Sequence, residues 1–441
     1  EKYGCVAGYP NGTYKGGQSM TRYEAAALLN ACLDRVTEVT DELQRLMEEF
    51  KAELATLRGR VDGLEKKVGK LEAQQFSTTT KLKGEVSMII GGSPDYNGDS
   101  KNPGVEADNQ VTFNYDVRLT LDTSFSGKDL LRTRLRSGNF SGDPLGSSGN
   151  VFKLDKAEEN ACDEGGNCVS IDRLFYTFPV GNQVKLTVGA LARNTEMLSF
   201  MPTAYKSGIL DFFNLAGATG TYNKATGAAA GLSWKQKVKK GNPFATFDVN
   251  WVSANAAADD GYANSEIGAF TEEGAQNILA QLGVKGQNWG AAVAYRYGTE
   301  NAGLRDPNSA PRYLDVDQVS NSVSLAGYWQ PMDSGFIPSI SAGFSYTDVS
   351  KADPGEDKIW SWMAGLQWKD VFMKGNSAGF AIGSPLFIED ENGTMYELFY
   401  KYKVSNNITV TPAIFWISNN YNDGNDGDGT WGGVIQTTFK F

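Results

Sequence analysis

The last eleven residues of the chain alternate between two kinds of side chain and end on an aromatic residue. One face of this segment carries Trp431, Gly433, Ile435, Thr437, Phe439 and Phe441, and the other carries Gly432, Gln436, Thr438 and Lys440. Side chains along a strand point to opposite faces with a period of two, so the pattern predicts a strand with one apolar and one polar face. The apolar face of such a strand has to be covered by a protein core or by lipid.

The same period-two alternation recurs between residues 82 and 441. Candidate strands are 82–91, 111–123, 129–137, 171–179, 183–193, 243–253, 287–297, 321–330, 336–347, 358–369, 395–404, 407–417 and 431–441. Two more are expected within 204–236 and one within 371–382, which brings the expected number to about 16. Short turns alternate with long polar stretches at 138–170, 254–286 and 299–320, as in bacterial outer-membrane barrels.

This pattern predicts an all-β transmembrane barrel of antiparallel strands over residues 82–441, and the terminal aromatic strand resembles the closing strand of such barrels. An even number of strands lets both termini lie on the periplasmic side. The alternative is a large soluble β-sandwich or β-helix protein, since sandwiches also end on alternating strands.

Two segments between the strands are open to more than one interpretation. Residues 271–282 are expected to form a short helix within the 254–286 loop, which either folds inward as a constriction or stays at the surface. The acidic run at 423–429 suggests divalent-cation binding, but it lacks the downstream Glu of a calcium loop. We therefore expect a flexible polar turn there and no metal site.

Composition excludes several classes of function. The chain has no histidine, which removes Ser-His-Asp and Cys-His nucleophiles and every His-ligated metal site. Its net charge of -11 argues against a nucleic-acid partner. No apolar run reaches the roughly 18 residues that a membrane-spanning helix needs. We expect no enzymatic activity and no cofactor.

The four cysteines are spaced as two local pairs, Cys5 with Cys32 and Cys162 with Cys168. Four cysteines allow three connectivities, and this spacing favours two local disulfides in an oxidising compartment. A metal site at residues 162–168 is the alternative to a disulfide there. It is the less favoured of the two, because the segment offers two thiols and no histidine.

The first 35 residues form a small module. The run GYPNGTY at residues 8–14 is typical of a tight turn. Thr21 and Glu24 are spaced as a capping box at the start of a helix that runs through residues 25–30. These residues resemble the second half of a surface-layer homology (SLH) module. The sequence departs from that pattern at Asn11, Lys15, Gly16 and Tyr23.

The SLH resemblance implies binding of acidic, often pyruvylated, peptidoglycan-linked polysaccharide by Gly8, Lys15 and Arg22. Arg22 lies in the first helical turn, where a guanidinium group and free backbone amides together favour an anion. The alternative is that Arg22 is a solvated charge and that Thr21 and Glu24 only cap the helix.

Residues 36–73 show a heptad repeat of apolar residues with one four-residue stutter between Phe50 and Leu54. A narrow apolar stripe of this length requires partner helices, so the pattern predicts a coiled-coil stalk and an oligomer. Valines at several a positions favour two strands, whereas SLH modules usually work in threes, which favours a homotrimer. Residues 74–81 are expected to be a linker.

A row of basic residues lies on the polar faces of the predicted strands: Arg118, Arg132, Arg134, Arg136, Arg173, Lys185 and Arg193. A charge that faces lipid near the bilayer midplane costs about 2–4 kcal/mol, so we expect these side chains to line a water-filled pore. They either attract anions or pair with acids such as Asp116, Asp122 and Asp172 to stiffen the wall, and the two roles are compatible.

The order of SLH fragment, coiled coil and barrel resembles the cyanobacterial outer-membrane porins related to the carbohydrate-selective porin (OprB) family, often described as iron uptake porins. The resemblance implies a homotrimer in the outer membrane, with its N-terminal module in the periplasm, that passes small solutes, chiefly inorganic ions, and tethers the membrane to wall polysaccharide. The alternatives are a sugar-selective channel and a structural surface-layer protein without a channel.

Overall fold

The computed structural model describes residues 17, 19, 21–33, 44–45, 48–51, 80–93, 110–140, 145–146, 152–158, 168–254, 268–304, 317–333, 335–352, 357–388, 391–418 and 429–441. The chain divides into two units, residues 1–75 and 76–441. In the first unit, helix α1 (Arg22–Leu33) begins directly after Thr21, where the sequence predicts a helix start. Most of the predicted coiled coil lies outside the described residues, and its described residues 44–45 and 48–51 are helical.

The second unit is one antiparallel sheet. Its strands are β1 (Thr80–Gly92), β2 (Thr112–Thr123), β3 (Leu130–Gly138), β4 (Ser170–Val180), β5 (Val184–Arg193), β6 (Thr226–Lys235), β7 (Phe244–Ser253), β8 (Gln276–Lys285), β9 (Trp289–Gly298), β10 (Ser320–Trp329), β11 (Ser339–Val349), β12 (Lys358–Lys369), β13 (Ser377–Ile388), β14 (Glu391–Asn392), β15 (Met395–Lys403), β16 (Ile408–Ile417) and β17 (Thr430–Lys440).

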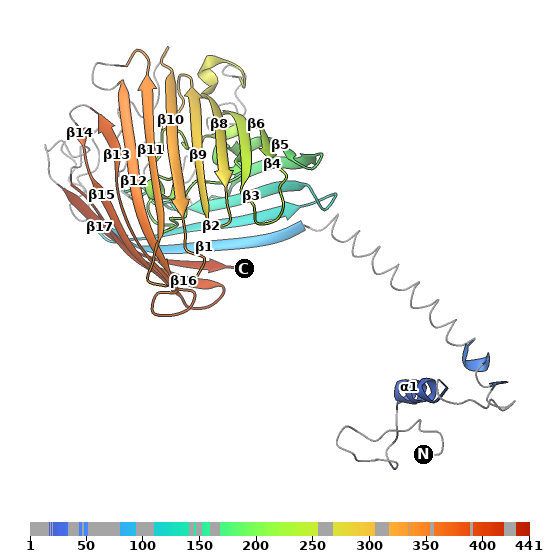
Figure 1. Cartoon of the computed structure of the whole chain (residues 1–441). Helices are drawn as coiled ribbons and strands as arrows, with labels where there is room; N and C mark the ends of the chain where they lie inside the picture. The colour runs from blue at the N-terminus through green and yellow to red at the C-terminus, as the bar shows by residue number, and fades with distance from the viewer. Residues whose placement is uncertain are drawn as a thin grey trace. The chain divides into compact units, whose positions relative to one another are not determined.

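The sheet closes on itself because β1 pairs with both β2 and β17. The two-residue β14 pairs with β13 just ahead of β15, so 16 strands make up the closed wall, as predicted. Both ends of the barrel chain lie at one end of the barrel, which we call the termini end (Figure 1). There the backbone of Phe441 exchanges two hydrogen bonds with Gly84, at 2.7 and 3.0 Å, and its ring covers the face of that glycine.

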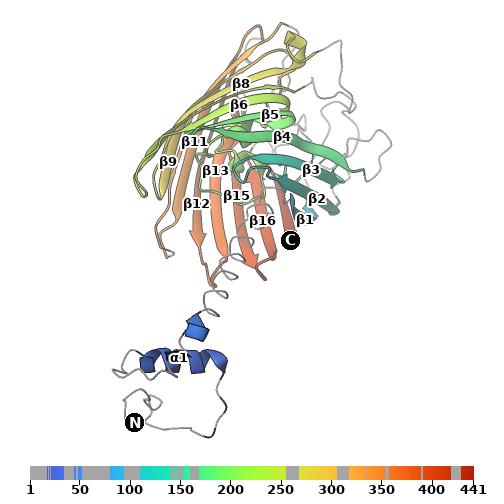
Figure 2. The same ribbon diagram turned by 90° about the vertical axis from the view of Figure 1, so that its right-hand side faces the viewer.

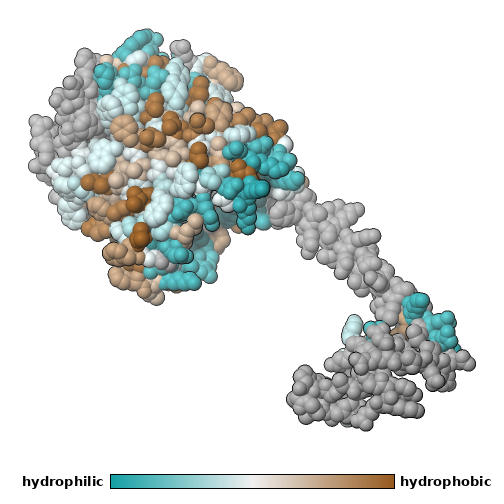
Figure 3. Space-filling view, viewed as in Figure 1, coloured by the Kyte–Doolittle hydropathy of each residue, from teal (hydrophilic) through white to brown (hydrophobic). Residues whose placement is uncertain are grey.

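The two faces of the wall differ in polarity as the sequence predicts. On β17, Trp431 is 49% exposed on the outside, whereas Gln436 is 4% exposed on the inside. Hydrophobic residues are spread widely over the outer surface in Figure 3. Within the described ranges, no helix combines the length and the apolar composition needed to cross a membrane.

Two predictions about the middle of the chain are wrong. Residues 271–282 do not form a helix: a short 3-10 turn, η2 (Glu272–Gly274), leads into strand β8. The 204–236 region holds one strand, β6, and not two. The predicted total of 16 is therefore right although one strand is misplaced.

One connection folds into the barrel. Residues 194–225, which we call the inward segment, join β5 to β6 and contain the 3-10 helix η1 (Asn194–Met197) and the short helix α3 (Asp211–Asn214). Its large apolar side chains, among them Tyr205, Ile209 and Phe213, are buried in a cluster with wall residues of β12 to β17. The barrel is viewed from a second side in Figure 2. The segment that narrows the described lumen is thus this connection, whereas residues 255–267 of the 254–286 loop lie outside the described residues.

Candidate functional site

A buried carboxylate on β15 anchors the middle of the inward segment. Glu397 is inaccessible to solvent and accepts a hydrogen bond from the Tyr205 hydroxyl at 2.7 Å and one from the Leu210 amide at 2.8 Å. The Ser341 hydroxyl on β11 accepts the amides of Ala204 and Tyr205 at 2.9 and 3.1 Å. A buried carboxylate requires such donors, so the backbone around residues 204–210 is fixed to the wall.

A buried arginine on β9 anchors the later part of the segment. Arg296 donates from Nε to the Gly220 carbonyl at 2.6 Å and from its terminal nitrogens to Asn277 and Ser320. Nearby, the Tyr222 hydroxyl donates to Gln281 on β8 at 2.8 Å. The middle and later parts of the segment are thus held against strands between β8 and β15.

The wall approaches the segment so closely at one point that only glycine fits. A Cβ built on Gly343 of β11 would lie 1.9 Å from the carbonyl oxygen of Ala216. No side chain tolerates such a distance, so the missing side chain lets the two backbones touch.

A second connection, residues 152–158 between β3 and β4, joins the inward segment. Leu154 and Leu210 form an antiparallel bridge, and the Lys224 ammonium contacts Asp155 at 2.6 Å and also Asp211. Burial opposes the charged form of Asp155, but Lys224, Lys156 and Arg118 outweigh it and hold the pKa of Asp155 well below its usual value. The two connections therefore form one layer inside the lumen.

Opposite this layer, β2, β3, β4 and β5 carry an arginine ladder, made of Arg118, Arg132, Arg134, Arg136, Arg173 and Arg193. Each arginine has an acceptor within reach. Arg132 pairs with Asp122 at 2.8 Å, and Arg136 pairs with Asp116 at 2.5 Å and with Glu158. Arg193 donates to the Thr226 hydroxyl at 3.1 Å.

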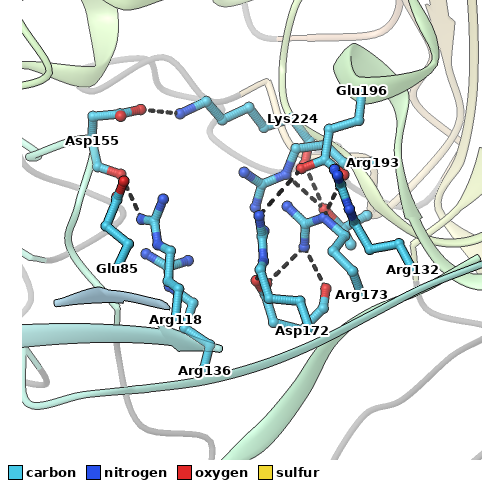
Figure 4. A network of polar contacts seen from close by, with 12 residues as sticks. Glu85, Arg118, Arg132, Arg136, Asp155, Asp172, Arg173, Arg193, Glu196 and Lys224 are labelled. Atoms are coloured by element: carbon cyan, nitrogen blue, oxygen red, sulfur yellow. Dashed lines mark hydrogen bonds and ion pairs between the residues drawn. The ribbon is translucent and has the colours of Figure 1, made fainter. Parts of the chain in front are cut away.

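The centre of the ladder is shared between two acids. Arg173 contacts Asp172 at 2.6 Å and Glu196 at 2.9 Å, and Arg134 contacts both of these carboxylates as well. Figure 4 shows Arg132, Arg173 and Arg193 gathered beside Glu196 and Asp172. Because carboxylates interleave with the guanidinium groups, most of the ladder's charge is neutralised within the wall, as in the stiffening role described above.

Two adjoining cavities lie between the ladder and the inward segment. One, of about 520 Å³, is lined by Arg118, Arg132, Arg134, Lys83, Glu85 and Lys440 among others. The other, of about 680 Å³, is lined by residues of the inward segment together with Lys401, Lys440 and polar residues of β16 and β17. Arg136 and Arg173 are buried behind this surface.

The other predicted site residues lie elsewhere or outside the described residues. Lys185 is exposed at the start of β5, away from the ladder's ion pairs. Arg22 is exposed in the first turn of α1, whereas Gly8 and Lys15 lie outside the described residues. Cys168 is disulfide-bonded. Its predicted partner Cys162, and Cys5 of the other pair, fall outside the described residues, as does most of the 423–429 run.

Sequence reasoning missed several charged residues of the lumen. Glu85, Glu397 and Lys401 stand on the polar faces of strands whose apolar faces are clear, so the alternation that located the arginines was also the signal for them. Lys156 and Lys224 come from connections, where no periodicity indicates direction. Lys156 pairs with Glu85, and Lys224 joins the two connections.

Known proteins resemble the chain over most of its length. An uncharacterized protein of Nostoc sp. is 34% identical over 487 aligned residues, covering 100% of this chain and 81% of the relative. One of Synechocystis sp. is 28% identical over 503, covering 100% and 87%. Over 72 residues, 14% of this chain and 6% of the relative, the chain is 40% identical to the outer membrane protein SlpA of Deinococcus radiodurans.

Solved porins share the fold at low sequence identity. The OprB of Pseudomonas putida, solved at high pH, superposes with a TM-score of 0.57 at 12% identity, covering 85% of this chain and 97% of that one. The anion-selective porin from Comamonas acidovorans gives a TM-score of 0.50 at 11% identity, covering 82% and 100%. A family model described as carbohydrate-selective porin, OprB family, matches residues 38–441. With a barrel of this architecture and a match over most of its length, the chain belongs to the OprB family of outer-membrane porins.

Proposed function

We propose that this porin is a passive channel for small hydrophilic solutes, chiefly inorganic ions, and that it prefers anions. The observation that carries the proposal is the lining of the two cavities, in which lysine and arginine outnumber aspartate and glutamate. A low-dielectric channel lined by one sign of charge concentrates ions of the opposite sign.

Carbohydrate passage is the second candidate, and the family description favours it. Sugar recognition uses flat aromatic faces, and among the residues that line the two cavities Phe441 is the only aromatic one. The large aromatic residues of the described interior, such as Tyr205 and Phe399, are buried in packing. Liposome swelling with a series of neutral sugars tests this candidate, and swelling faster than molecular size predicts would favour it over ions.

Planar-bilayer recordings across a KCl gradient test the ion channel. We expect a reversal potential of the sign that anion preference gives. Replacing Arg132, Arg134 and Arg136 by Gln removes three positive charges and takes one partner each from Asp122, Asp172 and Asp116, so it should reduce or reverse this preference. Replacing the turn lysines Lys237, Lys239 and Lys240 by Gln removes the same charge outside the cavities and serves as the control. Cation preference in the native protein would contradict the proposal.

The N-terminal unit supports a second, mechanical role through its SLH resemblance. We propose that the termini end faces the periplasm, that the stalk joins three chains, and that Gly8, Lys15 and Arg22 bind wall polysaccharide. Co-sedimentation with peptidoglycan that retains its polysaccharide should fall in an Arg22→Gln variant. If the native protein and the Arg22→Gln variant sediment equally, Arg22 is a solvated charge that does not contact the polysaccharide.

A further inference from the structure

The termini end of the lumen carries lysines whose charge, unlike that of the arginine ladder, is largely unneutralised. The lysine collar consists of Lys83 on β1, Lys206 in the inward segment, Lys285 at the end of β8, Lys401 on β15 and Lys440 at the end of β17. All four strand positions lie at the end where β1 begins and β17 finishes. The collar therefore surrounds one mouth of the channel.

Contacts show that the collar points into the lumen. Lys83, Lys206, Lys401 and Lys440 line the two cavities. The Lys401 ammonium donates to the Lys206 carbonyl at 3.0 Å. The Lys285 ammonium lies 5.5 Å from the ring centroid of Phe200, a residue of the inward segment.

The collar has few carboxylates to balance it. Lys83 contacts Asp122 at 2.7 Å, and Lys440 contacts Glu85 at 3.2 Å, but each of these acids also serves another cation. Among the described residues, no ion pair is formed by Lys206, Lys285 or Lys401. The charged neighbours of Lys285 are two further lysines, Lys206 and Lys235, while Lys401 has Lys440 and Lys156 beside Glu397 and Asp155.

The same mouth carries more lysines at inward strand positions. Lys185 and Lys235 lie on the faces of β5 and β6 that hold buried Thr187 and Ala229, and Lys369 shares its face of β12 with Gln367, which accepts the Lys206 amide at 2.8 Å. The positive potential therefore extends around the rim and is not confined to one pair of side chains.

We infer that this mouth is a binding site for small polyvalent, phosphate-bearing anions, which it takes up from the termini side. The inference rests on the proposed channel. Attraction to a ring of fixed charges grows with the charge of the ion, so a monovalent ion passes while a polyvalent one is held. A cavity of about 680 Å³ behind the collar admits a small anion and not a folded polymer. Such an anion, once bound, obstructs the path of other ions.

The test measures block of KCl current through the full chain in planar bilayers, with inorganic tripolyphosphate added to each side in turn. We expect block from one side only. The collar variant replaces Lys206, Lys285, Lys401 and Lys440 by Gln. It should raise the half-blocking concentration by roughly tenfold or more, because each lost charge acts within about one Debye length of the anion. The control variant replaces the turn residues Lys128, Lys237, Lys239 and Lys240 by Gln, which removes the same charge outside the two cavities. Its half-blocking concentration should rise much less than that of the collar variant.

The outcomes separate this inference from the channel proposal. Anion-preferring current without tripolyphosphate block would overturn the collar site and leave the channel intact. If both variants lose block equally, the block depends on the net charge of the protein and not on the collar, and the site is overturned. If the native protein does not conduct, calorimetric titration of the detergent-solubilised protein with tripolyphosphate tests whether the collar binds the anion. Binding that the collar variant loses would then support the site without the channel, and no binding would overturn it. Heat-modifiable gel migration verifies that each variant retains its barrel.

Discussion

The anchor at Glu397 gives a direct test of how the inward segment shapes the channel. Replacing Glu397 by Leu removes the acceptor of the Tyr205 hydroxyl and of the Leu210 amide, both of which are buried. An unsatisfied buried donor costs about 1–3 kcal/mol, so the change should disfavour the docked conformation by about 2–6 kcal/mol. The contacts of Arg296 and of Ser361 with the rest of the segment remain.

We therefore expect the variant barrel to stay closed while residues 207–210 loosen from the wall, because Ser341 and Gln367 still accept the amides of residues 204–206. Single-channel conductance and its noise should rise, and limited proteolysis should cut near these residues. Glu397→Gln is the matched control: it keeps one side-chain oxygen as an acceptor and should lie between the native protein and the Leu variant. Native conductance and native protease resistance in a folded Glu397→Leu barrel would refute the anchoring role of this carboxylate.

Three further changes probe other contacts. Gly343→Ala places a Cβ 1.9 Å from the Ala216 carbonyl oxygen, and overpacking of this kind costs about 1–3 kcal/mol. We expect a lower melting temperature and an altered conductance, and a variant with native values of both would contradict the close contact. Gly84→Val places a side chain against the Phe441 ring, which lies 2.2 Å from the Cβ position, and should impair the pairing of β1 with β17 that closes the barrel. The expected sign is loss of heat-modifiable gel migration. Gly433→Ala, whose nearest neighbour lies at 3.5 Å, is the control and should migrate normally. Because the pKa of Asp155 is lowered on folding, its ion pair stabilises the two connections above the unfolded pKa of about 3.9 and is lost as the pH falls through the lower folded value. An Asp155→Asn variant should therefore differ from the native protein in melting temperature at neutral pH and converge with it only in strong acid, and convergence already near neutrality would contradict the lowered pKa.

The wall of the barrel is predictable from the sequence because its physics is local. Each strand separates lipid from lumen, and the period-two pattern follows that separation residue by residue. On β17 the outward Trp431 and the inward Gln436 follow the alternation directly. The same alternation predicts that Arg118 and Arg132 face the lumen, and both side chains line a cavity there.

The two wrong predictions share a single cause. On β8, Ile278 faces outward and is 41% exposed, but its neighbour Leu279 is fully buried against Leu215 and Tyr222 of the inward segment. A strand with apolar residues on both faces loses its alternation and resembles a helix in sequence. The inward segment itself is apolar for the same reason, so its sequence resembles that of a wall strand. Alternation fails where the protein that fills the lumen packs apolar side chains against the inner face of a strand, as at Leu279.

Alternation predicts the lumen charge only in part: the pairs of Arg132 with Asp122 and of Arg136 with Asp116 follow from the strands themselves. The spacing on β3 shows that Arg134 and Arg136 face inward, but their second partners, Glu196 and Glu158, come from the inward segment and from another connection. Neutralisation of the ladder therefore depends in part on how two loops fold, which no periodicity encodes. Since the ladder is largely paired and the collar is not, removing ladder arginines should destabilise the wall through stranded carboxylates as well as shift selectivity, whereas removing collar lysines should shift selectivity alone. The melting temperatures of the ladder variant and the collar variant, compared at an equal change in reversal potential, separate the stabilising role from the selectivity role. Equal losses of stability would mean that the collar lysines also hold the wall together.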